Sequence, residues 1–196
     1  NVCAPSVSIV TSIGLDHQHV LGENIVQIAG EKAGIIKQGV PVVSGVVDPA
    51  AQSVVCSTAS EQDCSLVQLG RDFDCQSRAD DRWGSHIQYT GLGNPQRQIQ
   101  ARLPMEGKHQ GRNAAIAIAT LELLEHQGVA ISDSAVIEGL AGLKCPGRLE
   151  RFDLPDDVLA VVDVAHNEDS ITALCDCLRD RFADRSITVV FGTSVD

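Results

Sequence analysis

The fold is decided by residues 6–45, which read SVSIVTSIGLDHQHVLGENIVQIAGEKAGIIKQGVPVVSG. The run from Ser6 to Thr11 is β-branched and mostly apolar, which is typical of a buried strand. After a loop, Glu23 to Ile36 carries apolar residues along one side, which predicts an amphipathic helix. Val40 to Gly45 predicts a second strand, so this stretch alone indicates a strand–helix–strand unit.

The same alternation continues beyond this stretch. Asp48 to Glu61 predicts a helix and Ser65 to Leu69 a short strand. This order predicts an α/β fold with a mainly parallel sheet flanked by helices. Residues 70–104 break the pattern with charged clusters and glycines. Within them, Ser85 to Thr90 and Gln98 to Leu103 alternate in polarity, which predicts two antiparallel, partly exposed strands.

A domain boundary is predicted at Pro146-Gly147, because this dipeptide favours a turn. Two helices are expected before it, at Gly107 to Gln127 and at Ser132 to Leu143. The residues after it predict the start of a second α/β domain, so the expected division is 1–146 and 147–196. The elements expected there are strands at Leu149–Phe152, Val158–Val164 and Ile187–Phe191 and a helix at Glu168–Phe182.

The composition indicates a folded protein without a nucleic-acid or membrane partner. Hydrophobic residues make up 43% of the chain, and the formal net charge is −11, whereas a nucleic-acid backbone requires a basic face. The seven cysteines include no CxxC pair, which favours free thiols in a reducing cytoplasm over a zinc site. No signal peptide or bilayer-spanning run is present. Because the chain lacks an initial Met and stops after a strand-like run, we expect a piece of a longer cytoplasmic protein.

The first polar cluster follows the first predicted strand. Asp16 and His17 would project from the carboxyl edge of the sheet, where α/β folds bind ligands, and Lys32 lies on the apolar side of the next helix. An apolar setting lowers the pKa of a lysine, and the neutral amine can take up carbon dioxide. The resulting carbamate offers two anionic oxygens to a hard cation. The plainer alternative is a capping loop and a lysine that reaches water.

Three further clusters carry groups that suit a nucleotide. Asn113 lies in the first turns of a helix that begins with small residues, so its amide can pair with a base such as adenine, or the helix can simply pack through alanines. Arg148 can bind phosphate as a fork or pair with Glu150 at the surface. Asp163 and His166 follow an apolar strand and suit a ribose hydroxyl and a phosphate. No GxxxxGK[ST], GxGxxG or GxSxG motif accompanies them.

Taken together and in order, these clusters resemble folylpolyglutamate synthases and dihydrofolate synthases of the Mur ligase superfamily. The first block is long and specific, and the form of the GKHQ motif looks like the folate branch. The match spans nearly the whole chain. The segments that carry it are Thr11–His17, Leu21–Gly22, Ile28–Pro41, Gly107–Gln110 with Asn113–Ala115, Gly147–Glu150 and Asp163–Asn167.

The resemblance implies an ATP- and Mg²⁺-dependent enzyme that adds L-glutamate to a carboxylate of folate or dihydropteroate through an acyl phosphate. It implies that His17 and a carbamylated Lys32 hold metal and act in catalysis. It also implies a monomer in which residues 1–146 are the C-terminal portion of the ATP-binding central domain. Residues 147–196 would be the first part of a Rossmann-like ligase domain. The residues implied in ATP binding are Asn113, Arg148, Asp163 and His166.

Departures from the family pattern limit what this piece can do. The phosphate-binding loop and a metal-binding glutamate of the family normally lie upstream of Asn1, so we expect the piece alone to be inactive. Glu168 stands where the family usually has proline, which the first turn of a helix tolerates. Two alternatives remain open, namely a UDP-muramyl peptide ligase of the same superfamily and a catalytically dead, ligase-like binding domain.

Overall fold

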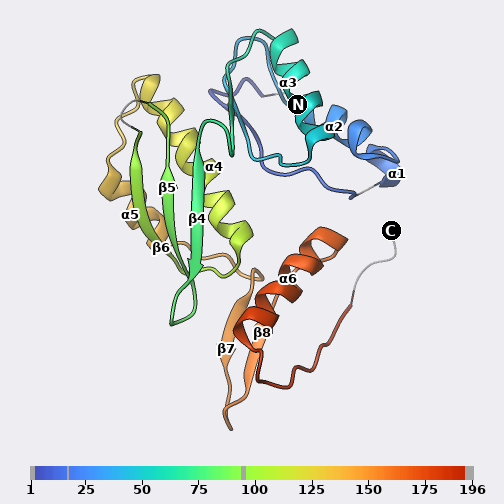
Figure 1. Cartoon of the computed structure of the whole chain (residues 1–196), viewed down its shortest axis with the longest axis vertical. Helices are drawn as coiled ribbons and strands as arrows, with labels where there is room; N and C mark the ends of the chain where they lie inside the picture. The colour runs from blue at the N-terminus through green and yellow to red at the C-terminus, as the bar shows by residue number, and fades with distance from the viewer. Residues whose placement is uncertain (1–2, 17, 94–95, 193–196) are drawn as a thin grey trace.

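The computed structural model describes residues 3–16, 18–93 and 96–192 and confirms an α/β fold (Figure 1). Its first sheet is parallel, in the order β1-β2-β3, with Ser8 opposite Val42 and Val42 opposite Leu66. The parallel pairing agrees with the strand–helix alternation of the sequence. The strands of this sheet are β1 (Ser8–Val10), β2 (Val42–Ser44) and β3 (Leu66–Gln68).

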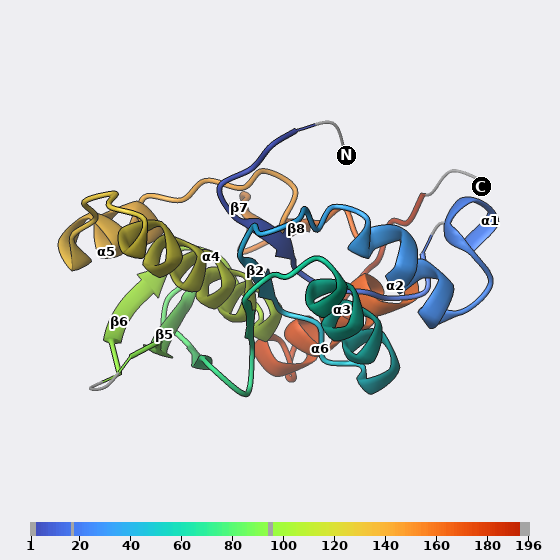
Figure 2. The ribbon, with the colours of Figure 1, turned by 90° about the horizontal axis from the view of Figure 1, so that it is seen from above.

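The parallel sheet is covered on both faces, which explains why its strands are almost entirely apolar. Val42 shares a core with Ile28 and Val55 on one face, whereas its neighbour Val43 shares a core with Ile116 on the other. Figure 2 shows β2 between α3 and α4. The helices up to this layer are α1 (Gln18–Leu21), α2 (Ile25–Ala33), α3 (Pro49–Glu61) and α4 (Lys108–His126).

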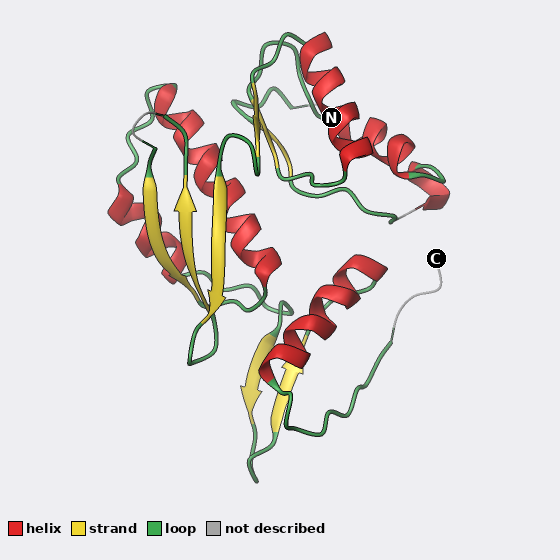
Figure 3. Cartoon of the chain, in the orientation of Figure 1, coloured by secondary structure: helices red, strands yellow, loops and turns green. Residues whose placement is uncertain are grey.

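A second, antiparallel sheet packs against α4 (Figure 3). In its central strand Ile87 and Tyr89 are buried, whereas Gln88 between them is exposed. The Tyr89 hydroxyl donates to the carboxylate of Glu122 on α4 at 2.6 Å, which ties sheet and helix together. The strands are β4 (Asp74–Ala79), β5 (Ser85–Thr90) and β6 (Gln98–Leu103), and α5 (Asp133–Ala141) packs on β6.

The residues after Pro146 form a hairpin and one helix. The helix begins with a capping box, in which the Asn167 side chain accepts from Ser170 N at 2.9 Å and the Ser170 hydroxyl accepts from Asn167 N at 3.1 Å. None of the helices in the described part of the chain is long and apolar enough to cross a bilayer. The elements are the antiparallel pair β7 (Glu150–Asp153) and β8 (Leu159–Val162), followed by α6 (Glu168–Arg181).

Several elements differ from the sequence prediction, and helix α1 lies in the segment that the sequence predicts to be a loop. Ile187 to Phe191, predicted as a strand, pairs with no strand among the described residues and is exposed. A strand requires neighbouring backbone for its N–H and C=O groups. The polar strand β4 is present although its residues, DCQSRA, do not predict a strand. Helix α2 begins two residues later than predicted, because Gln27 N donates to the side chain of Asn24 at 3.0 Å and so fixes the N-cap there.

Candidate functional site

A cavity of about 740 Å³ opens where the residues that follow β1 and β2 face the N-terminal ends of α4 and α6. The carboxyl ends of parallel strands lie at one edge of a sheet, so the two loops form one wall. The volume falls within the range of small-molecule sites, about 300–1,000 Å³. The lining comes from Thr11 to Asp16, from Gly45, Val47 and Asp48, from Lys32, from His109, Arg112 and Asn113, and from residues around Arg148, Asp163 and the first turns of α6.

The loop after β1 touches the first turn of α6. Asn167 Nδ2 donates to Asp16 Oδ2 at 2.8 Å, and His166 Nε2 lies 3.8 Å from the same oxygen. A Cβ at Gly14 would lie 2.0 Å from the carboxylate of Asp169, so a larger residue there would require the Asp169 side chain to move. Two clusters that lie about 150 residues apart in the sequence therefore meet at the cavity rim.

Lys32 reaches the cavity from the last turn of α2. It lies one helical turn after the fully buried Ile28, so its stem follows the buried face of the helix while the amine reaches the cavity. Among the described residues, no three His, Cys, Asp or Glu side chains gather as a metal site. Magnesium at nucleotide sites is usually held by one or two protein ligands together with phosphates and water, so this finding does not decide the metal site. The predicted ligand His17 lies outside the described residues.

The first turns of α4 orient the amide of Asn113. Asn113 Nδ2 lies 3.4 Å from Gln110 Oε1, and Gln110 Nε2 lies 3.1 Å from His109 Nε2. Asn113 is exposed, and its carbonyl oxygen accepts no hydrogen bond from a described residue, so it is available to a ligand as an acceptor. The helix starts at Gly107, whose φ of 96° and whose closeness to the His109 ring both exclude a larger residue.

His109 lies between the two arginines of the cavity and one carboxylate. Burial lowers the pKa of the His109 imidazole, Arg148 and Arg112 lower it further, and Asp163 acts in the opposite direction. These influences together lower the pKa of His109 and so favour the neutral ring. A neutral, half-buried ring beside a cavity offers a flat surface and one hydrogen-bond donor or acceptor to a ligand.

The turn that carries Arg148 is held by Asp163. Asp163 Oδ2 accepts from Leu149 N at 2.8 Å, and its Oδ1 accepts from Ala165 N at 2.7 Å. Leu149 has a φ of 48°, so the carboxylate stabilises a left-handed turn that leucine disfavours. Gly147 N donates to Glu150 Oε2 at 2.9 Å, and no ion pair joins Glu150 to Arg148 in the described structure. Arg148 is exposed, as the alternative reading expected, but the pair with Glu150 is not formed among the described residues.

The cavity holds cationic groups that lack acidic partners. Arg112, Arg148 and Lys32 form no ion pair with any residue that the structure describes. The chain as a whole has 26 acidic and 15 basic residues, so unpaired cations gathered at one cavity are notable against that background. The same lining also carries the carboxylates of Asp16, Asp48, Asp163 and Asp169, so an anionic group of a ligand would have to lie beside the three cations.

Four of the six predicted site residues line this cavity, namely Lys32, Asn113, Arg148 and Asp163. His166 is not among the lining residues, but it lies 3.8 Å from Asp16, which is one of them. Sequence reasoning missed Arg112, which lies directly before Asn113 on the exposed side of α4. A basic residue next to the candidate adenine contact was the only available signal.

Comparison with known proteins finds relatives along the whole chain. Residues 147–196 match the family described as Mur ligase, glutamate ligase domain. Folylpolyglutamate synthase of Lacticaseibacillus casei is 36% identical over 197 aligned residues, which cover 100% of this chain and 45% of that protein. The dihydrofolate synthase/folylpolyglutamate synthase of Bacillus subtilis gives the same identity and coverage. The chain thus spans less than half the length of these curated relatives.

Solved structures agree with the sequence comparison. A structure described as an FPGS–AMPPCP–folate complex superposes with a TM-score of 0.84 at 34% identity, over 94% of this chain and 44% of that one. The folylpolyglutamate synthase of Mycobacterium tuberculosis, complexed with ADP and AMPPCP, gives a TM-score of 0.79 at 32% identity, over 90% and 40% of the two chains.

Proposed function

We infer the function from the family, since this chain belongs to the Mur ligases, in the branch of folylpolyglutamate and dihydrofolate synthases. We propose that the protein is an ATP-dependent ligase that joins L-glutamate to a carboxylate of folate or dihydropteroate. The observation that supports this most is the single cavity that gathers Lys32, Asn113, Arg148 and Asp163 from four separate parts of the chain.

The proposed reaction has two steps that balance. In the first, the substrate carboxylate attacks the γ-phosphorus of ATP, which forms an acyl phosphate and releases ADP. In the second, the amine of glutamate attacks the acyl carbon, the C–O bond to phosphate breaks, and the amine loses a proton as inorganic phosphate leaves. Both steps place negative charge on phosphoryl oxygens, so the protein must supply cations around them.

Four side chains are proposed to bind ATP, namely those of Asn113, Arg148, Asp163 and His166. The available carbonyl oxygen of Asn113 suits the exocyclic amine of adenine, and Arg148 suits the phosphates, since it has no acidic partner among the described residues. Both oxygens of Asp163 already accept one backbone N–H each. Each keeps a further acceptor position, so a ribose hydroxyl can still donate to it.

The catalytic and metal roles are also proposals. Lys32 as a carbamate and His17 would hold Mg²⁺, which supplies Lewis-acid stabilisation of the phosphates when bound. His166 would contact the phosphates from the cavity rim, where it lies beside Asp16. The Lys32 amine lines the cavity and has no acidic partner among the described residues, which is compatible with modification by carbon dioxide.

The domain organisation that we propose follows from the same family assignment. We propose that residues 1–146 belong to the ATP-binding central domain and residues 147–196 to the C-terminal ligase domain, with the nucleotide between them. The seven free cysteines suit a reducing cytoplasm. We also propose a monomer that uses no nucleic acid and no membrane.

The test is glutamate-dependent release of ADP by the protein expressed from its complete gene. Dihydropteroate, tetrahydrofolate and a UDP-muramyl peptide are supplied side by side. Release with a pterin substrate supports the proposal and separates the synthase from the polyglutamate activity. Release with the muramyl substrate alone assigns the protein to cell-wall ligases. No release with any of the three indicates a ligase-like binding domain.

A further inference from the structure

The far end of α6 is held by the hairpin that joins β4 to β5. Trp83 in this hairpin stacks on Phe182 with ring centroids 6.0 Å apart, and its indole N–H donates to Leu149 O at 3.1 Å. The guanidinium of Arg181 lies 5.9 Å from the Trp83 ring centroid. We call Trp83, Glu106, Arg181 and Phe182 together the hairpin clamp.

A buried ion pair forms the centre of the hairpin clamp. Glu106 is only 2% exposed and accepts from Arg181 Nε at 3.0 Å and from Gly84 N at 2.6 Å, while Arg181 Nη2 pairs with its other side. Arg181 Nη2 also donates to the carbonyl oxygens of Arg82 at 3.0 Å and Gly84 at 2.9 Å. Four polar contacts around one guanidinium fix its position. Removing the charge of Arg181 leaves the buried carboxylate of Glu106 without a cationic partner.

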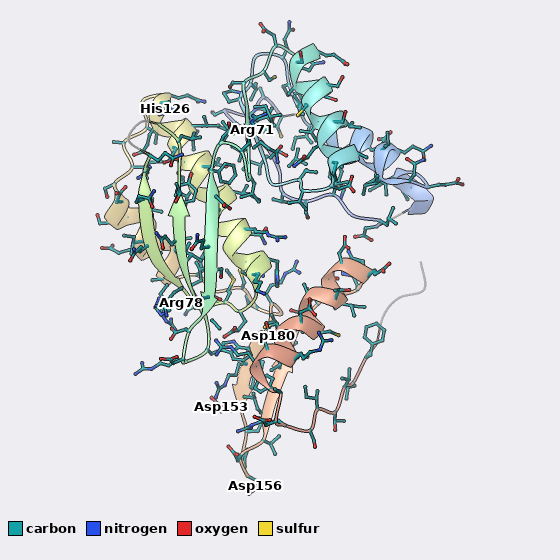
Figure 4. The ribbon with its side chains drawn as sticks, in the orientation of Figure 1. Arg71, Arg78, His126, Asp153, Asp156 and Asp180 are labelled. Atoms are coloured by element: carbon teal, nitrogen blue, oxygen red, sulfur yellow. The ribbon has the colours of Figure 1, made fainter. Side chains whose placement is uncertain are left out.

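Helix α6 is otherwise weakly anchored. Cys177 is the only buried residue of this helix, and neither a helix nor a strand of the described chain packs extensively along it. A short second cavity of about 380 Å³ separates α6 from β4, with Arg78 and Asp180 on its two sides (Figure 4). The position of α6 is therefore determined chiefly at its two ends.

The two ends of α6 contact different parts of the molecule. Its 14 residues span about 21 Å, and the cavity lining ends at Leu174, about 10 Å along the helix axis from Arg181. At the cavity end the contacts include a hydrogen bond from Asn167 to Asp16 and the close approach of Asp169 to Gly14. The first turns of α6 then form one wall of the cavity.

We propose that the hairpin clamp sets the width of the cavity by holding α6, and that Glu106 and Arg181 are positioning residues for the nucleotide. The proposal rests on the proposed function, since it takes ATP as the ligand of the cavity. Neither residue lines the cavity of about 740 Å³. Arg181 connects to the cavity through α6, whereas Glu106 also directly precedes Gly107, where α4 begins, so exchange in α6 is the readout specific to the clamp. A rigid helix transmits a displacement at one end to the other with little loss.

The test compares Glu106→Gln with the wild type in the complete protein. Glutamine keeps the shape and an acceptor for Gly84 N but removes the charge that Arg181 requires. We expect amide exchange at residues 166–170 to become about tenfold faster. We also expect the KM for ATP to rise about tenfold, while kcat at saturating ATP falls less than about threefold. The matched control is Arg179→Gln on the same helix, which removes only an exposed pair with Asp176 and should change neither quantity.

The possible results distinguish a failure of the hairpin clamp from a failure of the proposed nucleotide site. Unchanged exchange at residues 166–170 overturns the clamp, and so does faster exchange with an unchanged KM for ATP. If the wild-type protein does not bind ATP, the proposed function fails, while faster exchange in the variant still supports a clamp on α6. Should Glu106→Gln not fold, Trp83→Phe replaces it. That variant keeps an aromatic stack on Phe182, loses the bond to Leu149 O, and should raise the KM for ATP in the same direction.

Discussion

The carboxylate of Asp163 is expected to stabilise the turn at Leu149, and Asp163→Asn measures how much. In the wild type both oxygens accept a backbone N–H, at 2.8 Å from Leu149 and 2.7 Å from Ala165. Asparagine keeps one oxygen, whose bond is no longer charge-assisted, which costs about 1 kcal/mol. Its amide NH₂ faces the second N–H, which loses its acceptor at a further cost of about 2 kcal/mol. The expected loss of stability is therefore about 3 kcal/mol.

The assay for this prediction is thermal unfolding followed by far-UV circular dichroism. For a chain of this size, about 3 kcal/mol corresponds to a fall in Tm of about 6–12 °C. The matched control is Asp153→Asn on the neighbouring strand, whose carboxylate is 74% exposed and pairs only with Arg151. It should cost less than about 0.5 kcal/mol. If both variants melt together with the wild type, the carboxylate of Asp163 does not hold the turn and the reasoning is refuted.

Three further predictions concern His109, Cys177 and Lys32. The lowered pKa of His109 means that the unfolded chain binds a proton that the folded chain rejects, so stability falls as the pH drops below about 6.5. His109→Gln should reduce the difference between urea midpoints at about pH 7.5 and 5.5, and an unchanged difference would contradict this. Burial raises the pKa of the Cys177 thiol to about 11. Iodoacetamide at pH about 8 should therefore label exposed Cys145 and spare Cys177 until the protein unfolds, and mass spectrometry measures the labelling of each cysteine. Lys32→Ala should abolish ligation without changing the circular dichroism spectrum, and unchanged turnover would refute the role of its amine.

The parts of the fold that the sequence predicts are those with a strong local pattern. Strands β5 and β6 have the predicted bounds, since each alternates buried and exposed residues and packs one face on the core. Strand β4 lies at the edge of the same sheet, and its polar residues give no such pattern. For Ile187 to Phe191 the local pattern predicts a strand, but a strand also depends on a neighbour that local sequence does not encode.

The residues of the candidate site also fall into those that local sequence predicts and those that it does not. Lys32, Asn113, Arg148 and Asp163 were predictable because each is a polar residue at a strand end or in a helix turn near one. The hairpin clamp was not, because Trp83 and Arg181 lie 98 residues apart and each is unremarkable in its own segment. The cap of α6 by Asn167 is local, whereas its bond to Asp16 depends on how the two parts of the chain pack.

The central claim is that the cavity between α4 and α6 binds a nucleotide. The most direct test is isothermal titration of AMPPCP into the complete protein, its Asn113→Ala and Arg148→Gln variants, and the control Arg179→Gln. We predict saturable binding to the wild type and the control, and about tenfold weaker binding to each cavity variant. Absence of binding to the wild type, or equal affinity in all four proteins, would contradict the claim.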